Sequence, residues 1–288
     1  MTTTTQTKGK KSCVLDIATT DVVSVPPTMN IIEGLSKMST HNFRRLPLTD
    51  AGTKKLLGIV TVTDVIDLMG GGNRFNLVAN KHKGNLLSVF NDEIRMIATE
   101  NVDGLSPSAT IREAAEKLIK TGHGSFPIVN DDNTLAGIVT EYDIMKVLAS
   151  EKSEKMVCDV MTKDPQVVTP DVPICKVTRL MVTHGFRRLP VVKDNFLIGI
   201  ITATDIMKYL GGGKVFADME QGKADEILMI PVREIMTAAD IKTVTSTTTL
   251  TEAAKMMIEY GVGVFPVLDG DELNGIVTEF DLVKALAE

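Results

Sequence analysis

Four segments of this chain repeat the same landmarks in the same order, which constrains the fold more than any other feature of the sequence. Each segment opens on a short apolar stretch, continues with a β-branched run and a helical pattern, and ends with two apolar strand patterns and a short helix. The last strand pattern reads Gly, two apolar residues and Thr, and it leads into an Asp. We number the segments copies one to four, with expected bounds 13–72, 93–150, 156–213 and 231–288.

The pattern within one copy predicts the order strand, helix, strand, strand, helix. In copy two, Ile111, Ala114, Ala115, Leu118 and Ile119 recur at helical spacing and predict the buried face of the first helix. Two helices on one face of a three-stranded sheet cannot bury both sides of the sheet, so we expect the copies to pair. The expected fold class is α/β of the α+β type. The matching helical face of copy four consists of Leu250, Ala253, Ala254 and Met257.

A longer period groups the copies in twos. Copies one and three share Phe-Arg-Arg-Leu-Pro, at 43–47 and 186–190, and a run of three glycines, at 70–72 and 211–213. Copies two and four lack both features and share Thr-Glu-aromatic-Asp instead. We therefore expect a duplicated two-copy module with a break near residue 151, which gives modules 13–150 and 151–288.

Composition excludes several classes of protein. With 43% apolar and 24% charged residues, the chain has the profile of a soluble globular protein. Its apolar stretches are far shorter than the roughly 20 residues of a membrane helix. Residues 1–12 lack the apolar region of a secretory signal and are expected to form a disordered tail. We expect no membrane association.

The cysteines and the net charge narrow the choice further. Three cysteines without a close pair suggest neither a disulfide framework nor a zinc site, and they favour a reducing cytoplasm. A net charge of -6 argues against a general nucleic-acid surface, although local basic pockets can still hold small anions.

The motif Gly-apolar-apolar-Ser/Thr-x-x-Asp, found four times, resembles that of the cystathionine beta-synthase (CBS) domain family. The resemblance covers nearly everything after residue 13. It implies that two copies pack into a Bateman module and that two modules form a flat disc, similar in layout to the gamma subunit of AMP-activated protein kinase. It also implies that AMP, ADP or ATP binds in clefts between paired copies, and no resident cofactor is expected.

The Asp of each motif has two alternative roles. It stands where a strand gives way to a helix, so it can act as a helix N-cap. The resemblance implies instead that its carboxylate accepts hydrogen bonds from both ribose hydroxyls, which requires that one oxygen stays free of capping. The neighbouring Thr is ordinary for a strand, yet its hydroxyl can also help to hold an anion at a helix N-terminus. The resulting candidates are Thr61, Thr63, Asp64, Thr140, Asp143, Thr202, Thr204, Asp205, Thr278 and Asp281.

The pairs Arg44-Arg45 and Arg187-Arg188 occur only in copies one and three, whereas copies two and four have Gly124-Ser125 and Gly263-Val264 at the matching places. Guanidinium groups bind phosphate oxygens in bidentate fashion, and the resemblance implies that basic residues here reach the phosphates of a nucleotide. Adjacent strand residues point to opposite faces, so only one Arg of each pair is expected to reach a given pocket, and the other is expected to be a surface or salt-bridge residue.

The glycine runs are followed by Arg74 or Lys214, but they lack the Gly-Lys-Ser/Thr ending and the preceding strand of a P-loop, so they are interpreted as linkers. Weaker candidates are His41 and His184, which at such positions are more often helix ends than ligands, and Arg95 and Arg233, which can contact phosphate but stand at copy boundaries where an exposed Arg needs no function.

No constellation of nucleophile, base or metal ligands stands out, and no enzymatic activity is expected. The main hypothesis is a sensor of AMP, ADP or ATP that changes conformation to control an unidentified partner protein, and the chain can also form a homodimer. One alternative is a sensor of another adenosyl ligand such as S-adenosylmethionine, whose cationic sulfonium the arginine pairs disfavour. A scaffold or nucleic-acid-associated module with empty clefts is the other alternative.

Overall fold

A computed structural model of the chain describes residues 13–150, 153–220 and 224–287. The expected tail at 1–12 and the expected break near residue 151 lie outside these ranges. All four copies contain a first helix, a β-hairpin and a closing helix. These elements are α1 Ile31–Thr40, β1 Arg45–Thr49, β2 Leu56–Thr61 and α2 Val62–Gly70 in copy one; α4 Ile111–Thr121, β3 Ser125–Val129, β4 Leu135–Thr140 and α5 Glu141–Leu148 in copy two; α6 Ile174–His184, β6 Arg188–Lys193, β7 Phe196–Thr202 and α7 Ala203–Leu210 in copy three; and α10 Leu250–Tyr260, β8 Val264–Asp269, β9 Glu272–Thr278 and α11 Glu279–Ala287 in copy four.

Shorter elements open the copies and connect them. Every copy begins with a single turn of 3-10 helix, and helical segments join copy one to copy two and copy three to copy four. The opening turns are Val14–Asp16, Ile94–Ile97, Val157–Asp159 and Val232–Glu234, the connecting helices are the π-helical Leu77–Lys81, α3 Leu86–Phe90, α8 Gly213–Glu220 and α9 Ala224–Met229, and β5 is Thr162–Lys163.

The first helices form where the sequence predicts them. In α4, Thr110 and Glu113 form a capping box at the N-terminus, and Gly122 ends the helix in a left-handed conformation with a φ of 68°. Ala114, Ala115 and Leu118 are buried on the expected face. The helical periodicity of the sequence therefore correctly predicted how this helix packs.

The expected first strand of each copy is wrong in form. Within the described residues, only copy three has a strand there, the two-residue β5, while the others make single bridges. In copy two, Thr99 bridges Ile59 of copy one, but Leu105 bridges Ile128 of its own copy. Between them Asn101 has a φ of 51°, and this left-handed residue turns the chain from one hairpin to the other.

These bridges link the copies in pairs. Thr19 of copy one exchanges backbone hydrogen bonds with Ile138 of copy two, and Thr99 does the same with Ile59 in the opposite direction. Likewise β5 of copy three pairs with β9 of copy four, and Thr237 bridges Ile200. Each hairpin thus receives a segment from its neighbour, and the opening segments are shared rather than local.

The helices join the copies in the other direction. One apolar core combines buried residues of copies one and three with the opening turns of copies two and four, and a second core combines those of copies two and four with the opening turns of copies one and three. Gly70 and Gly211 allow the close approach in the first core, because a Cβ at either position would lie 2.5 or 2.6 Å from a backbone carbonyl oxygen of the opposite copy. Both glycines are buried at ends of α2 and α7, so the interpretation of the glycine runs as mere linkers is wrong for these two.

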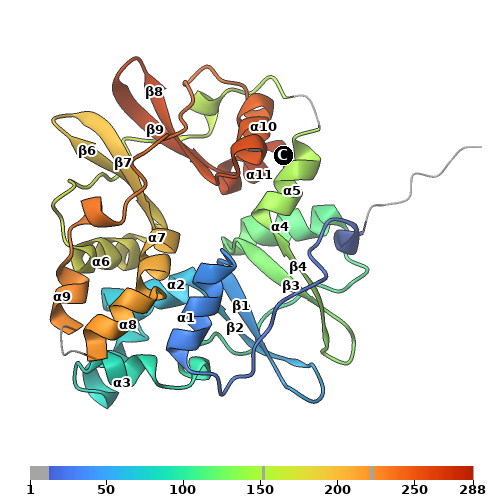
Figure 1. The fold of residues 1–288 in the computed structure, drawn as a ribbon. Coiled ribbons are helices and arrows are strands. Elements are labelled where there is room, and N and C mark those ends of the chain that lie inside the picture. The colour runs from blue at the N-terminus through green and yellow to red at the C-terminus, as the bar shows by residue number, and fades with distance from the viewer. Residues whose placement is uncertain (1–12, 151–152, 221–223, 288) are drawn as a thin grey trace, which may run out of the picture.

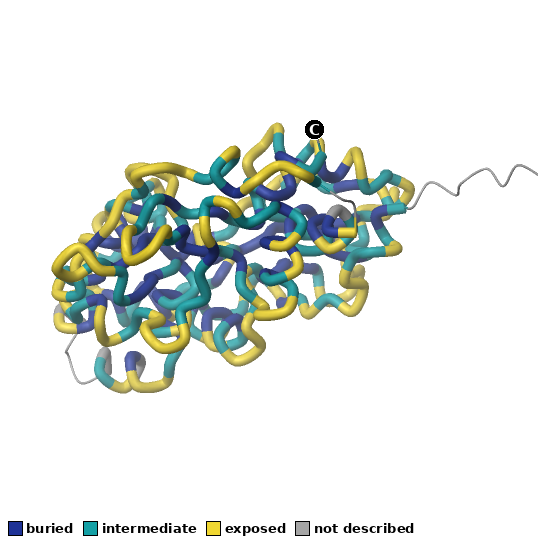
Figure 2. Tube along the Cα trace, turned by 90° about the horizontal axis from the view of Figure 1, so that it is seen from above, coloured by how far each residue is buried: buried dark blue, intermediate teal, exposed yellow. Residues whose placement is uncertain are grey.

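The four copies consequently close into a ring (Figure 1), in which β1–β2 and β3–β4 lie on one side and β6–β7 and β8–β9 on the other. Seen from above, the molecule is flattened (Figure 2). No described helix is long and apolar enough to cross a membrane. The turns of the hairpins lie at the periphery of the ring, and the opposite ends, where the strands join the helices, lie toward its middle (Figure 1).

Candidate functional site

A cavity of about 610 Å³ opens at the centre of the ring and is lined by all four copies. Copies one and three each contribute an arginine pair and the Thr-x-Thr-Asp exit of the last strand. The volume lies within the range of roughly 300–1,000 Å³ that is typical of small-molecule sites. Ten of the predicted residues line this cavity: Arg44, Arg45, Thr61, Thr63, Asp64, Arg187, Arg188, Thr202, Thr204 and Asp205.

A second cavity of about 420 Å³ lies between copies one and two. Thr140 lines it together with Arg44 and Arg45, which therefore border both cavities. The predicted residues Asp143, Thr278 and Asp281 line neither cavity. The structure thus brings the candidates of copies one and three together and leaves Asp143 of copy two and both candidates of copy four apart.

The strand exit has the same geometry in every copy. The motif Thr is the residue before the helix, and Oδ2 of the Asp accepts hydrogen bonds from its backbone N–H and its hydroxyl at 2.6–3.0 Å. This is the return half of a capping box, in which Thr is the N-cap and Asp is the third helical residue. The alternative that Asp itself is the N-cap is therefore wrong.

The capping box leaves the other carboxylate oxygen for a ligand in three copies. Within the described residues, Oδ1 of Asp143, Asp205 and Asp281 has no hydrogen bond or ion pair. In copy one, Oδ1 of Asp64 lies 2.6 Å from Nη2 of Arg74. Capping and ligand binding can therefore coexist, but the four carboxylates are not equivalent.

Burial raises the pKa of Asp64, Asp205 and Asp281 above the ordinary value of 3.8. Hydrogen bonds from the motif Thr act in the opposite direction in all three. A partly buried carboxylate with a free oxygen, as in Asp205 and Asp281, is a strong acceptor for hydroxyl groups, because charge-assisted hydrogen bonds are stronger than neutral ones.

The arginine pairs form two diagonal contacts across the ring. Arg44 of copy one lies 3.1 Å from Glu279 of copy four, and Arg187 of copy three lies 4.0 Å from Glu141 of copy two. Both glutamates are buried and directly follow the motif Thr. Arginine pairs in copies one and three are thus matched by glutamates in copies two and four.

Glycines make room for these contacts. A Cβ at Gly263 would lie 2.8 Å from the Glu279 carboxyl carbon, and one at Gly124 would lie 3.2 Å from Oε1 of Glu141. This explains why copies two and four have glycine where copies one and three have the first Arg. Burial also raises the pKa of Glu141, whose Oε1 has no hydrogen-bond partner among the described residues.

The second Arg of each pair begins a strand and lines the same cavity as the first. Burial lowers the pKa of Arg45 to about 10, so it remains charged at neutral pH, and it lowers the pKa of Arg188 as well. Arg188 donates to the carbonyl oxygen of Gly263 at 2.5 Å. The prediction that only one Arg of a pair reaches a given pocket is wrong, because Arg44 and Arg187 precede the strands and escape their alternation.

The weaker candidates lie elsewhere. His41 and His184 stand at the C-terminal ends of α1 and α6, where their rings stack on Phe43 and Phe186. Arg95 contacts Glu93, and Arg233 contacts Asp171; neither arginine lines the two cavities. Cavity residues that the sequence did not single out include His123, Lys208, Lys242, Asn101 and Asp240.

Ring closure and ligand-sized cavities between the copies define a tandem-repeat protein with the architecture of a small-molecule binding module. The CBS domain family matches this chain over 14–71, 94–150, 157–212 and 232–288, so the chain belongs to that family. The resemblance noted from the sequence is thereby confirmed, as is the expected fold class.

Proteins of similar sequence and structure match this chain over nearly its whole length. The uncharacterized protein MJ1225 of Methanocaldococcus jannaschii is 40% identical over 268 residues, 92% of this chain and 95% of that protein. The crystal structure of MJ1225, proposed as an archaeal homologue of g-AMPK, has a TM-score of 0.89 and 39% identity over 95% of this chain and 99% of that chain. An uncharacterized 33.4 kDa protein of Thermofilum pendens is 25% identical over 262 residues, 91% of this chain and 87% of that protein.

Proposed function

We propose that this chain is a regulatory protein that binds AMP, ADP or ATP in the clefts of its ring and thereby controls a partner protein. One observation carries this proposal: the central cavity combines four arginines with two Thr-x-Thr-Asp exits. Carboxylate oxygens suit ribose hydroxyls, and guanidinium groups suit phosphates. A nucleotide carries ribose hydroxyls and a phosphate close together, so one ligand can contact both kinds of side chain.

The electrostatics favour a phosphate-bearing ligand over a sulfonium. The lining of the central cavity has six basic side chains, Arg44, Arg45, Arg187, Arg188, Lys208 and Lys242, and five acidic ones, Asp64, Asp103, Glu141, Asp205 and Asp240. The preference for phosphate therefore depends on the four guanidinium groups themselves, which can bind phosphate oxygens, whereas S-adenosylmethionine would bring a cation close to them. We therefore expect AMP, ADP or ATP to bind more tightly than S-adenosylmethionine.

The regulatory role follows from the position of the cavity between copies. A ligand that contacts several copies can shift their relative packing, but only by as much as its affinity differs between the two arrangements. We place the shift between the paired copies whose strand exits line the central cavity, because two apolar cores pack modules 13–150 and 151–288 together. This role needs no catalytic group, and within the described residues no cluster of three or more His, Cys, Asp or Glu is placed to hold a metal.

Titration calorimetry with AMP, ATP, adenosine and S-adenosylmethionine at one ionic strength tests the proposal. We expect AMP or ATP to bind most tightly. Replacement of Arg45 by Met should weaken AMP binding by about 10- to 150-fold, as expected for the loss of about 1.5–3 kcal/mol from one charge-assisted hydrogen bond, and should leave adenosine binding unchanged.

Arg233→Met is the matched control, since Arg233 lies outside both cavities. Tighter binding of S-adenosylmethionine than of any nucleotide would favour a different adenosyl sensor. Absence of heat with all four ligands would contradict ligand sensing and favour a scaffold.

A further inference from the structure

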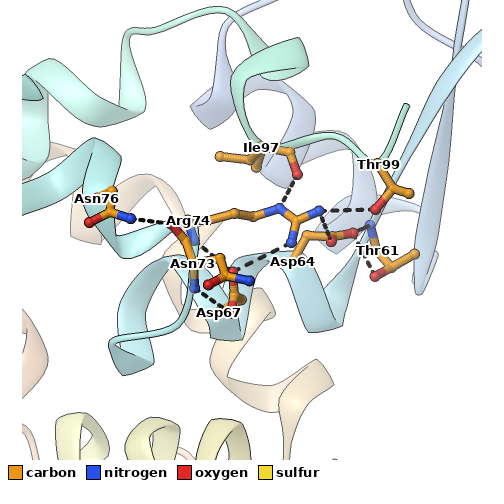
Figure 3. A network of polar contacts seen from close by, with 8 residues as sticks. All are labelled: Thr61, Asp64, Asp67, Asn73, Arg74, Asn76, Ile97 and Thr99. Atoms are coloured by element: carbon orange, nitrogen blue, oxygen red, sulfur yellow. Dashed lines mark hydrogen bonds and ion pairs between the residues drawn. The ribbon is translucent and has the colours of Figure 1, made fainter. Parts of the chain in front are cut away.

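The carboxylate of Asp64 differs from those of the other three copies because a side chain of the same chain already holds its second oxygen. Nη2 of Arg74 lies 2.6 Å from Oδ1 of Asp64, and the two side chains are 24% and 8% exposed (Figure 3). Oδ2 of Asp64 accepts from the N–H and the hydroxyl of Thr61. Both oxygens of this carboxylate are therefore engaged.

Arg74 is fixed by contacts on several sides. Its Nε donates to the carbonyl oxygen of Ile97 at 2.5 Å, and its Nη2 donates to the hydroxyl of Thr99 at 2.9 Å. Nη1 lies 3.4 Å from Oδ2 of Asp67. Ile97 and Thr99 belong to the opening segment of copy two, so the guanidinium ties Asp64 to the neighbouring copy.

A local device directs Arg74 back to Asp64. Gly71 ends α2 in a left-handed conformation with a φ of 86°, which reverses the chain. Asp67 then accepts from the backbone N–H groups of Asn73 and Arg74 at 3.2 and 2.8 Å. A Cβ at Gly72 would lie 1.6 Å from Oδ1 of Asp67, so only glycine leaves room for this carboxylate.

Copy three lacks the device. Lys208 stands in the place of Asp67, and the buried Val215 stands in the place of Arg74. Asp205 accordingly keeps Oδ1 free of hydrogen bonds and ion pairs among the described residues. The two strand exits that line the central cavity are thus alike in sequence, but the residues after their closing helices differ.

The number of acceptor sites shows what this difference means for a ribose. An ionised carboxylate offers about four lone-pair sites. Thr202 takes two of those on Asp205, which leaves a pair for two hydroxyl groups. Thr61 and Arg74 together take three of those on Asp64, and the bulk and charge of the guanidinium cover the remaining lone pair.

We propose that Arg74 closes the Asp64 side of the central cavity to ribose, so that a nucleotide in this cavity binds through Asp205 while Asp64 stays paired with Arg74. The inference rests on the proposed function. Because a ribose at Asp64 would have to displace a buried, charge-assisted contact, its affinity there should be at least about 100-fold weaker than at Asp205.

Calorimetry with AMP on the full chain tests the inference. Arg74→Val, which copies the residue of copy three, should add one binding site to the number found in the unmodified chain. Asp64→Asn in the Arg74→Val background should remove that added site. Arg95→Val is the matched control, because Arg95 is a nearby exposed arginine whose ion pair is with Glu93, and it should add no site.

Equal numbers of AMP sites in the unmodified chain and in Arg74→Val would show that Arg74 does not keep ribose from Asp64, and would leave the proposed function intact. Failure of both chains to bind AMP would overturn both proposals. A crystal of the unmodified protein grown with AMP gives a second test that does not depend on how a variant folds. We expect ribose at Asp205 and the Arg74–Asp64 contact intact; ribose on Asp64 would refute the inference.

Discussion

Replacement of Asp205 by Asn separates ligand binding from helix capping. Asp205 uses Oδ2 to accept from the N–H and the hydroxyl of Thr202 at 2.8 and 2.6 Å, while Oδ1 is directed to no described protein group. An Asn can keep its oxygen toward Thr202. Its amide nitrogen then replaces the charged acceptor on the side of the cleft.

The two effects differ in size. Loss of even one charge-assisted hydrogen bond from a ribose hydroxyl removes about 1.5–3 kcal/mol, which weakens binding by at least about 10-fold. The capping contribution at risk is about 1 kcal/mol, and it is partly offset because the variant no longer buries a charge. We therefore expect a large loss of AMP affinity in calorimetry with a small change in the free energy of unfolding.

Glu252→Gln is the matched control for Asp205→Asn. Glu252 closes an identical capping box with Thr249 at the start of α10, but it is exposed and lines neither cavity. It should show a similar change in the free energy of unfolding and unchanged AMP affinity. Full AMP affinity in Asp205→Asn, measured with a correctly folded protein, would refute the assignment of Oδ1 to the ligand and leave Asp205 with capping alone.

Two further predictions concern stability. Gly70→Ala should lower the free energy of unfolding by about 1–3 kcal/mol in a urea titration, because its Cβ would lie 2.5 Å from the carbonyl oxygen of Thr178. Gly213→Ala is the control and should have little effect, because the space around Gly213 is open. Equal stability of the two variants would contradict this packing. Burial raises the pKa of Glu141 in the folded protein above its ordinary value of 4.5. Between pH 4.5 and the folded pKa, the native state therefore binds more protons than the unfolded state, and the free energy of unfolding falls as the pH rises. Glu141→Gln should flatten the stability profile in that window, and an unchanged slope would show that burial does not perturb this carboxyl.

The sequence predicted the repeat, the helical faces and the strand exits because these depend on local periodicity. The spacing of Ala114 and Leu118 determines which side of α4 is buried, and the Thr and Asp of each motif lie three residues apart on one turn of backbone. Such features need no knowledge of the partner copy. The expected family and fold class also depend on these local patterns, and both are confirmed.

Several of the errors involve contacts that no local pattern indicates. The opening segments were expected as strands of their own copies, yet Thr19 and Thr99 bond to hairpins of neighbouring copies. One Arg of each pair was expected to be a surface or salt-bridge residue, but its partner could not be predicted, because Glu141 and Glu279 come from the diagonally opposite copies. Arg74 was passed over as part of a linker, because no local pattern indicates that the chain folds back onto Asp64.

The shared apolar cores have a consequence for cooperativity. In a linear solenoid each repeat contacts only its neighbours, so repeats can fray from one end. Here each core draws on one copy from either half of the chain, and the first copy meets the third rather than only the second. Melting of any one copy would strip apolar cover from both adjoining partners, so this fourfold repeat should unfold as one unit rather than stepwise.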